Sequence, residues 1–499
     1  MGLLEPIPQR DWIVAGGFLI SLLAFLATVE GLSRRLNPDA EKVRKIVHFA
    51  TGLAVLPTPF LFENFIPMMV IALGFAAANA WSIRQGTIGV YNRSERRSLG
   101  TVYYPLALAI LLPLFWHESA SLLLIPFAVM AFGDPVAAMI GARASRKLPL
   151  PHPWDAKSAP GFMAMLFAST VIVWIGLALD ISSLGLSAWQ VLVIGIGVGA
   201  IAAAAEALSY RGSDNLSVAL LSAALLKLFL TPGMFLQTLA GECLAALMVI
   251  LSMRWRALDI SGGIAAFWVG TFIFAAGGWA MSLPLIVFFV TSSFLSKWVK
   301  QRKRGDDGRF RMASSRDAMQ VLANGGLPMV LAILSIWWPH PMIFFLYLAG
   351  VASAAADTWA TEIGLLSGQT PRSIVSGRPV PPGSSGGITL PGLMGAAAGS
   401  SVVAFSAIIT PSAQFWPSWG GFSVLALVAL SGFLAHLFDS VLGATLQHKA
   451  ACGVCGMETE HRLHCNRPTR HVAGLRWLDN DGVNLACSLS GMLIAAALI

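Results

Sequence analysis

The sequence predicts an all-α polytopic integral membrane protein, with about 14–16 transmembrane helices in two bundles. Of the 499 residues, 56% are hydrophobic and 12% are charged, whereas soluble chains carry about 25% charged residues. The mean hydropathy is +0.71. Apolar stretches long enough for membrane helices alternate with polar or basic loops along the whole chain. We therefore expect two membrane domains, at residues 1–230 and 231–499.

The basic residues predict the orientation of these helices. The chain has 33 Lys and Arg, and all but Arg10 and Lys227 fall in clusters separated by two apolar stretches each. The turns between the paired stretches, near residues 63, 117, 182, 232, 280, 339 and 415, carry none. By the positive-inside rule we expect the basic loops in the cytoplasm and the N-terminus outside, as in a bacterial inner membrane or its equivalent. The first apolar run, residues 12–31, is too long for a signal peptide core, so we expect a retained helix.

Three carboxylates mark a candidate site in the first half. Asp134 lies within an apolar segment, Glu206 ends another, and Asp214 begins the next. An aspartate at such a position is also typical of an N-cap. Ionisable residues in membrane segments are costly and indicate function. Because three oxygen ligands on one face suit a magnesium–triphosphate complex, we predict that these residues bind Mg²⁺ and act in catalysis.

Polar and basic neighbours of these carboxylates predict a nucleotide site. Lys157 lies in a basic Gly/Ser loop that precedes an apolar segment, and we expect it on the phosphates. The other expected substrate- or nucleotide-binding residues of this half are Arg44, Lys45, His48, Ser158 and Asn215. The alternative for residues 37–52 is a cytoplasmic loop that runs into a helix without contacting a ligand.

A second set of acids lies in the other half. Asp357 and Glu362 occur in one apolar segment, where they lie about 140° apart around a helix, and packing does not explain two carboxylates there. Asp439 lies near the end of a later segment, and Asp481 begins the last one. We predict all four as catalytic, and Asp357, Glu362 and Asp439 also as Mg²⁺ ligands. Arg316 or Arg378 is expected to bind a substrate phosphate. Ser384, Ser385 and Gly386 lie in a loop that could wrap an anion or be a flexible turn. The remaining expected binding residues are Asn480 and Asn484.

The loop at residues 448–482 carries a different signal. Cys-x-x-Cys followed at short range by His and Cys fits a tetrahedral zinc site. Cys452, Cys455, His464 and Cys465 are the expected ligands of a structural zinc ion, with His461 as the other histidine within reach. The alternative is a reduced, metal-free loop. The remaining cysteines, Cys243 and Cys487, lie in apolar segments and are expected to serve packing.

The two halves share a short pattern. GDPVAAMIG, from residue 133, and ADTWATEIG, from residue 356, both have Asp, then Ala three, Ile six and Gly seven residues later. Each is followed by a Ser/Gly loop and later by an Asp-Asn pair before a helix. An ancient duplication and chance similarity among common membrane residues both explain the pattern.

Five ordered blocks make the first half resemble the phytol kinase and dolichol kinase group of membrane polyprenol kinases. They are RKIVHFATG (44–52), GTVYYPLAL (100–108), GDPVAAMIG (133–141), the loop from Lys157-Ser158 to Gly161, and EALSYRGSDNLSV (206–218). That group has a Glu-Gly-Ser triplet after the Lys-Ser, where this chain has Pro160, Gly161 and Phe162. The resemblance implies phosphoryl transfer, usually from CTP, to a long-chain isoprenoid alcohol.

Four blocks in the second half resemble the phytyl phosphate kinases and their transmembrane protein 19-like animal relatives. They are ADTWATEIG, PPGSSGGIT, FDSVLGATLQ and LDNDGVN, in that order over residues 250–499. This resemblance implies phosphorylation of an isoprenyl monophosphate to the diphosphate. Together the two resemblances predict a bifunctional salvage kinase whose partners are CTP or another nucleoside triphosphate, the prenol and its monophosphate, and membrane lipids.

Other functions remain possible at this stage. A cytidylyltransferase that makes CDP-lipids would use the same nucleotide and release diphosphate. A transporter would place its carboxylates near the middle of the membrane, whereas these lie towards one face. No nucleic-acid partner is expected.

Overall fold

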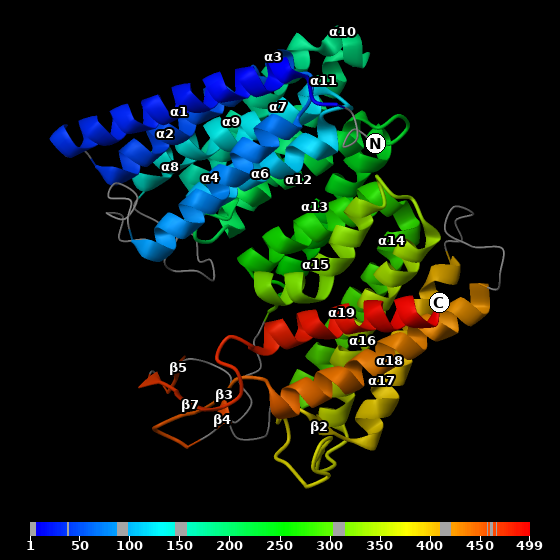
Figure 1. Cartoon of the computed structure of the whole chain (residues 1–499). Helices are drawn as coiled ribbons and strands as arrows, with labels where there is room; N and C mark the ends of the chain where they lie inside the picture. Colours follow the sequence, from blue (N-terminus) through cyan, green and yellow to red (C-terminus); the bar gives the residue numbers. More distant parts are fainter. Residues whose placement is uncertain are drawn as a thin grey trace. The chain divides into compact units, whose positions relative to one another are not determined.

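The computed structural model describes residues 6–36, 39–86, 98–144, 157–302, 315–409, 421–456, 458–459, 463–465 and 467–499, except for the side chains of residues 40, 41, 181, 458, 459, 463 and 464. The chain is helical and divides into two compact units, Met1–Leu239 and Ala240–Ile499, which are described separately (Figure 1). The sequence placed this division between residues 230 and 231.

The protein is an integral membrane protein of the all-α class. Within the described residues, eleven helices are long and apolar enough to cross a membrane, and two shorter apolar helices accompany them. The sequence led us to expect more spans than this, and two features of the helices account for the difference. The 43-residue helix Ile260–Arg302 contains two of the expected segments, joined at Gly278, whose backbone is not helical (φ 54°, ψ −146°). Other expected segments form helices of only 16 or 17 residues.

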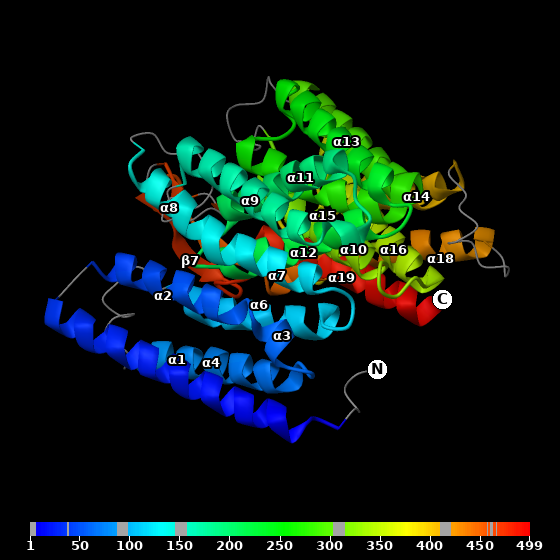
Figure 2. The ribbon, with the colours of Figure 1, turned by 90° about the horizontal axis from the view of Figure 1, so that it is seen from above.

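The first unit packs around a few deeply buried helices. Figure 2 shows α1 at the edge of the unit, away from α9 and α11, and few of its residues are buried. By contrast, most of α11 and of the continuous span Ala120–Ala142 is buried. The helices of this unit are α1 (Gln9–Leu36), α2 (Ala40–Val55), α3 (Thr58–Leu61), α4 (Ile66–Gln85), α6 (Gly100–Phe115), α7 (Ala120–Ala128), the π-helical turn η2 (Val129–Gly133), α8 (Asp134–Ala142), α9 (Ala159–Leu179), α10 (Ile181–Leu184), α11 (Ala188–Leu208) and α12 (Asp214–Leu230).

The turns without basic residues gather at one end of the first unit. The Trp116 indole donates to the Glu63 carbonyl at 3.2 Å, and the Ser121 hydroxyl donates to Asp180 at 2.6 Å. The two basic residues outside the clusters also lie at this end. Arg10 pairs with Glu63 at 3.1 Å and Lys227 pairs with Glu118 at 2.5 Å, so each has a carboxylate partner.

In the second unit, α16 is central and packs against α14, α15, α17, α18 and α19. Its buried Tyr347 donates a 2.6 Å hydrogen bond to the Met281 carbonyl, just after the Gly278 bend. The helices are α13 (Phe235–Arg254), which begins in the first unit, α14 (Ile260–Arg302), α15 (Ala318–Leu334), α16 (Pro341–Leu366), α17 (Leu390–Ser406) with the turn η3 (Ala407–Ile409), α18 (Gly421–Thr445) and α19 (Asn480–Leu498).

Short strands occur only in loops of the second unit, among the described residues. β1 (Arg372–Ser373) pairs antiparallel with β2 (Gly387–Ile388). Between α18 and α19, a three-stranded sheet has the order β4 (Glu458–Thr459), β3 (Lys449–Ala451), β7 (Arg470–Ala473), and β5 (Leu463–His464) pairs with β6 (Arg467–Pro468). Figure 1 shows this segment in orange and red at one end of α18 and α19.

The same local arrangement occurs once in each unit. In the first, Ser158 caps α9 by accepting from the Gly161 amide at 3.2 Å. A Cβ on Gly141 of α8 would lie 3.1 Å from the Ser158 hydroxyl and 3.3 Å from the Gly161 Cα. A side chain at this position would push these groups apart by a few tenths of an ångström, so glycine favours the close approach of α8 to the start of α9.

In the second unit the equivalent positions are Thr389, Gly392 and Gly364. Thr389 caps α17 by accepting from the Gly392 amide at 3.1 Å. A Cβ on Gly364 of α16 would lie 3.1 Å from the Thr389 hydroxyl and 3.7 Å from the Gly392 Cα. Both caps read Ser/Thr-x-Pro-Gly, so the pattern shared by the two halves has a structural counterpart.

Candidate active sites

The three predicted carboxylates of the first unit meet at one point. Asp134 is the first residue of α8, Glu206 lies in the last turn of α11, and Asp214 is the first residue of α12. One oxygen from each lies within 4.8 Å of the others. Asp134 and Glu206 are each only 7% exposed. Asp134 directly follows the π-helical turn η2, a distortion that is frequent at functional sites.

Lys157 is the cation of this cluster. It forms an ion pair with Glu206, and its ammonium lies 3.9 Å from Asp214 Oδ2. Burial alone would lower the pKa of Lys157, but the charges of Glu206 and Asp214 outweigh it and raise the pKa above its ordinary value. The ammonium is therefore charged at neutral pH. The second oxygen of Glu206, Oε2, is buried without a hydrogen-bond partner among the described residues.

The neighbours of these residues hold the loops in place. The hydroxyl of Ser158, which we expected to bind the nucleotide, is used by the α9 cap. Asn215 is 2% exposed, and its amide donates to the Gly212 carbonyl at 3.1 Å. Gly212 has φ 86°, and a Cβ there would lie 2.4 Å from the Gly100 amide nitrogen. The start of α6 is thus in direct contact with the loop that carries Asp214.

A cavity of about 540 Å³ opens beside this contact. It is lined mainly by apolar side chains of α1, α2, α4 and α6. Its polar lining includes Asn79 of α4 and, at the start of α6, Gly100 and Thr101. A cavity of this volume and composition is typical of a site for an apolar ligand with a polar head. Because Gly100 touches the Asp214 loop, the polar end of the cavity adjoins the carboxylate cluster.

His48 connects the cavity and the cluster. It lines the cavity and is 9% exposed. One ring nitrogen lies 3.4 Å from the Met130 carbonyl in η2, and the charge of Asp214 acts on the ring. Tyr104 packs against His48 with ring centroids 4.3 Å apart. Of the basic residues expected here, Arg44 also lines the cavity, whereas Lys45 is half-buried on α2 and does not line it.

The acids of the second unit are arranged differently. Oδ1 of Asp357 lies 3.3 Å from Nδ1 of His436 in α18. Glu362 instead accepts a 2.5 Å hydrogen bond from the hydroxyl of Ser296 in α14. Their five-residue spacing thus directs them towards different helices. Asp357 and Asp439 both act electrostatically on Cys487 of α19. Within the part of the chain that the structure describes, the predicted acids of this unit do not form a group of three like that of the first unit.

Arg316 lies at a second, smaller cavity of about 220 Å³. Its guanidinium packs 5.8 Å from the ring centre of Phe288 and 5.7 Å from that of Phe289. Burial lowers the pKa of Arg316, and the charge of Glu362 opposes this shift. The cavity is mainly apolar, and its polar lining residues are Arg316, Gln320, Asn324, Ser252 and Ser282.

The Gly/Ser loop is held against the end of α18. Ile374 donates to the Gly386 carbonyl at 3.0 Å, and Gly387 donates to that of Ser384 at 3.0 Å. Gly386 has φ 78°, and a Cβ there would lie 2.5 Å from the Ser440 carbonyl. The loop therefore lies beside Asp439 as an ordered turn. Arg378, the alternative phosphate ligand, is exposed.

At the start of α19, Asp479 caps the helix by accepting from the Gly482 amide at 3.0 Å. The expected residues Asp481 and Asn484 are half-buried there, and Asn480 is exposed. Sequence reasoning missed one residue of this unit, His436. It could have been found as an ionisable side chain three residues before Asp439 on one helix face. The blocks DNLSV (214–218) and DNDGV (479–483) also align Asp479 with Asp214.

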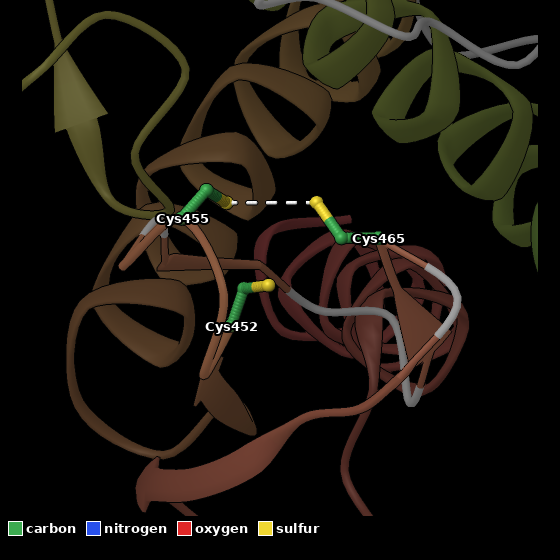
Figure 3. Close-up of side chains that lie close together, drawn as sticks. All are labelled: Cys452, Cys455 and Cys465. Atoms are coloured by element: carbon green, nitrogen blue, oxygen red, sulfur yellow. Dashed lines mark hydrogen bonds between the residues drawn. The ribbon is translucent and has the colours of Figure 1, made fainter.

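The three cysteine thiols of the loop between α18 and α19 also lie together. Figure 3 shows Cys452, Cys455 and Cys465 with their sulfur atoms directed towards one another. The three sulfurs lie within 4.8 Å of each other. The side chain of His464, the expected fourth ligand, is outside the described residues, as is His461.

Comparisons with known proteins identify one membrane-protein family and several relatives, one of which is named a phytol kinase. The family described as "Integral membrane protein DUF92" matches residues 243–492. Protein PGR of Arabidopsis thaliana is 33% identical over 264 residues, which cover 49% of this chain and 90% of that protein. The phytol kinase of Synechocystis is 32% identical over 227 residues, 44% of this chain and 92% of the kinase. Protein VTE6 of A. thaliana is 27% identical over 247 residues, 48% of this chain and 64% of that protein. No solved structure matches the chain significantly.

The ion pair of Lys157 yields a stability prediction. Lys157→Met should lower the free energy of unfolding by about 3 kcal/mol, because it leaves buried carboxylates without a cation. Arg10→Met removes an exposed pair whose side chains are 64% and 61% exposed, and should cost less than about 1 kcal/mol. Unfolding of the purified protein in detergent, with and without Mg²⁺, measures both effects. Mg²⁺ should stabilise Lys157→Met more than the wild type, and an equal effect on both would contradict the proposed exchange of cations.

Proposed function

We propose that this chain, which belongs to the DUF92 family of integral membrane proteins, is a bifunctional kinase for a long-chain isoprenoid alcohol such as phytol. It would convert the alcohol to the monophosphate and then the monophosphate to the diphosphate, with CTP as the phosphoryl donor. One observation carries the proposal: the polar end of an apolar cavity adjoins a cluster of three carboxylates, two of them buried, and a lysine. The similarity to a phytol kinase supports it.

The first unit suits phosphoryl transfer to an alcohol. The isoprenoid chain would lie in the 540 Å³ cavity, where burial stabilises it by about 0.8 kcal/mol per methylene. Asp134, Glu206 and Asp214 fit Mg²⁺ because they offer oxygens around one point and one of these oxygens lacks a partner. A bound Mg²⁺ would neutralise phosphate charge. Lys157 would then release its carboxylate partners and bind the phosphates.

In this step the alcohol oxygen forms a bond to the terminal phosphorus of the nucleotide, and the bond from that phosphorus to the nucleoside diphosphate breaks. The hydroxyl proton passes to a base. His48 lies between the cavity and the cluster, and a carboxylate of the cluster is the alternative acceptor. The residues mainly position the reactants and balance charge, which is what phosphoryl transfer requires of a protein.

The second unit suits a substrate that already carries a phosphate. Arg316 borders the apolar 220 Å³ cavity, so a prenyl chain there would place its monophosphate beside a guanidinium. The contact between His436 and Asp357 resembles that of a catalytic base with the carboxylate that orients it. Among the described residues, the predicted acids of this unit do not surround one point, so they do not fit a Mg²⁺ ion as those of the first unit do.

Separate substitutions test the assignment of one step to each unit. The purified protein is incubated with phytol and labelled CTP, and the lipid mono- and diphosphates are separated. The wild type should form diphosphate, Asp134→Asn should form no lipid phosphate, and Asp357→Asn should stop at the monophosphate. Release of inorganic diphosphate with formation of a CDP-lipid would instead show a cytidylyltransferase and contradict the proposal.

The cavity of the first unit yields a prediction about substrate length. Ala78 of α4 lines the cavity, whereas the adjacent Ala77 does not, and both are exposed. Ala78→Trp should raise the KM for phytol by about tenfold because the indole fills space needed by the chain, with the KM for CTP unchanged. Ala77→Trp is the matched control and should behave as the wild type. A shift towards shorter prenols in Ala78→Trp would follow from the same cause, and equal kinetics of the two variants would place the substrate elsewhere.

A further inference from the structure

The loop between α18 and α19 gathers three thiols that the phosphoryl-transfer sites do not use. Cys452 follows β3, Cys455 lies three residues later, and Cys465 follows β5. Their sulfur atoms lie within 4.8 Å of one another, and those of Cys455 and Cys465 are 3.9 Å apart (Figure 3). Cys455 and Cys465 are exposed, so packing does not account for their approach.

The distance between the sulfurs distinguishes the possible states. A disulfide bond holds its sulfur atoms about 2.05 Å apart, so 3.9 Å is far too long for one. Two thiolates bound to one tetrahedral zinc ion, each at about 2.3 Å, are about 3.8 Å apart. The observed separation therefore has the size that a shared zinc ion requires.

The backbone around the thiols is also arranged as around a metal site. The Val454 amide donates to Cys452 Sγ at 3.4 Å, and such hydrogen bonds orient metal-bound thiolates and disperse their charge. Gly456 donates to the Cys452 carbonyl at 2.9 Å, which closes the Cys-x-x-Cys turn. Cys465 has φ 51°, a strained conformation for a residue other than glycine, and it places this thiol near the other two.

We propose that Cys452, Cys455 and Cys465 bind a structural zinc ion as three thiolates. The proposal rests on these three residues. The sequence offers His464 for the fourth coordination position.

The place of this site in the fold indicates what the zinc ion stabilises. The segments that enter and leave the loop are hydrogen-bonded to each other. The Leu475 amide donates to the Leu446 carbonyl and the His448 amide donates to the Leu478 carbonyl, both at 2.8 Å. The next residue, Asp479, caps α19. Zinc would close the far end of the loop and so hold the start of α19 against the end of α18. Its role is structural, because its three cysteine ligands line neither of the two cavities described above.

The metal content of the full-length protein tests the proposal. Protein purified in detergent without added chelator should contain about one zinc ion per chain by elemental analysis. Replacement of zinc by Co²⁺ should give the thiolate charge-transfer and visible bands of a tetrahedral cobalt site. Absence of zinc from the wild type, together with no binding of added Zn²⁺, would overturn the proposal, as would stoichiometric iron in its place.

Matched cysteine variants locate the ion. Cys465→Ser should lose zinc by more than about tenfold, whereas Cys243→Ser, which changes an exposed cysteine on α13, should retain it. Retention of zinc by Cys465→Ser would exclude the site. If that variant does not fold, the metal content and cobalt spectrum of the wild type decide the question. Chelation should also increase cleavage of the loop at residues 452–476 in limited proteolysis, and unchanged cleavage would overturn the bracing role.

Discussion

Burial of like charges at the ends of membrane helices is the constraint on which the first unit depends. Asp134, Glu206 and Asp214 come from three helices and meet where little water reaches, so they need a cation to remain charged. Lys157 supplies it from the residue before the α9 cap. Under the proposed function, this lysine would leave the carboxylates when a metal–nucleotide complex arrives. Stability and proposed function thus rest on the same four side chains.

The two units combine a shared framework with different chemistry. Each has a Ser/Thr-x-Pro-Gly cap in contact with a glycine on the preceding helix, and this glycine lies two turns after an aspartate. The residue before the cap is Lys157 in the first unit and Ile388 in the second. The second unit therefore has no lysine at this position, and among the described residues Arg316, on a different element, is the cation that interacts with Glu362. This difference suits a substrate that brings its own phosphate.

The sequence predicted what depends on charge and hydropathy, and missed what depends on packing. Asp134, Glu206 and Asp214 could be grouped because each lies at the same end of an apolar segment. The role of Ser158 as a cap, the contact of Gly100 with Gly212, and the cavity between α1, α2, α4 and α6 depend on how helices distant in sequence pack together. The two segments expected on either side of residue 280 are both present, and they meet at Gly278, where the backbone is not helical. Asp357 and Glu362 were correctly placed on different faces of one helix, but their partners, His436 and Ser296, required the structure.

The most direct test of the central claim, that each unit catalyses its own step, bypasses the first site. Phytyl monophosphate and labelled CTP are supplied to the purified Asp134→Asn variant, and the diphosphate is measured. The account predicts diphosphate at the wild-type rate, because the second unit holds its own acids, arginine and cavity. Loss of diphosphate formation in this variant, with the protein folded, would contradict it and show that both phosphoryl transfers use the cluster of Asp134, Glu206 and Asp214.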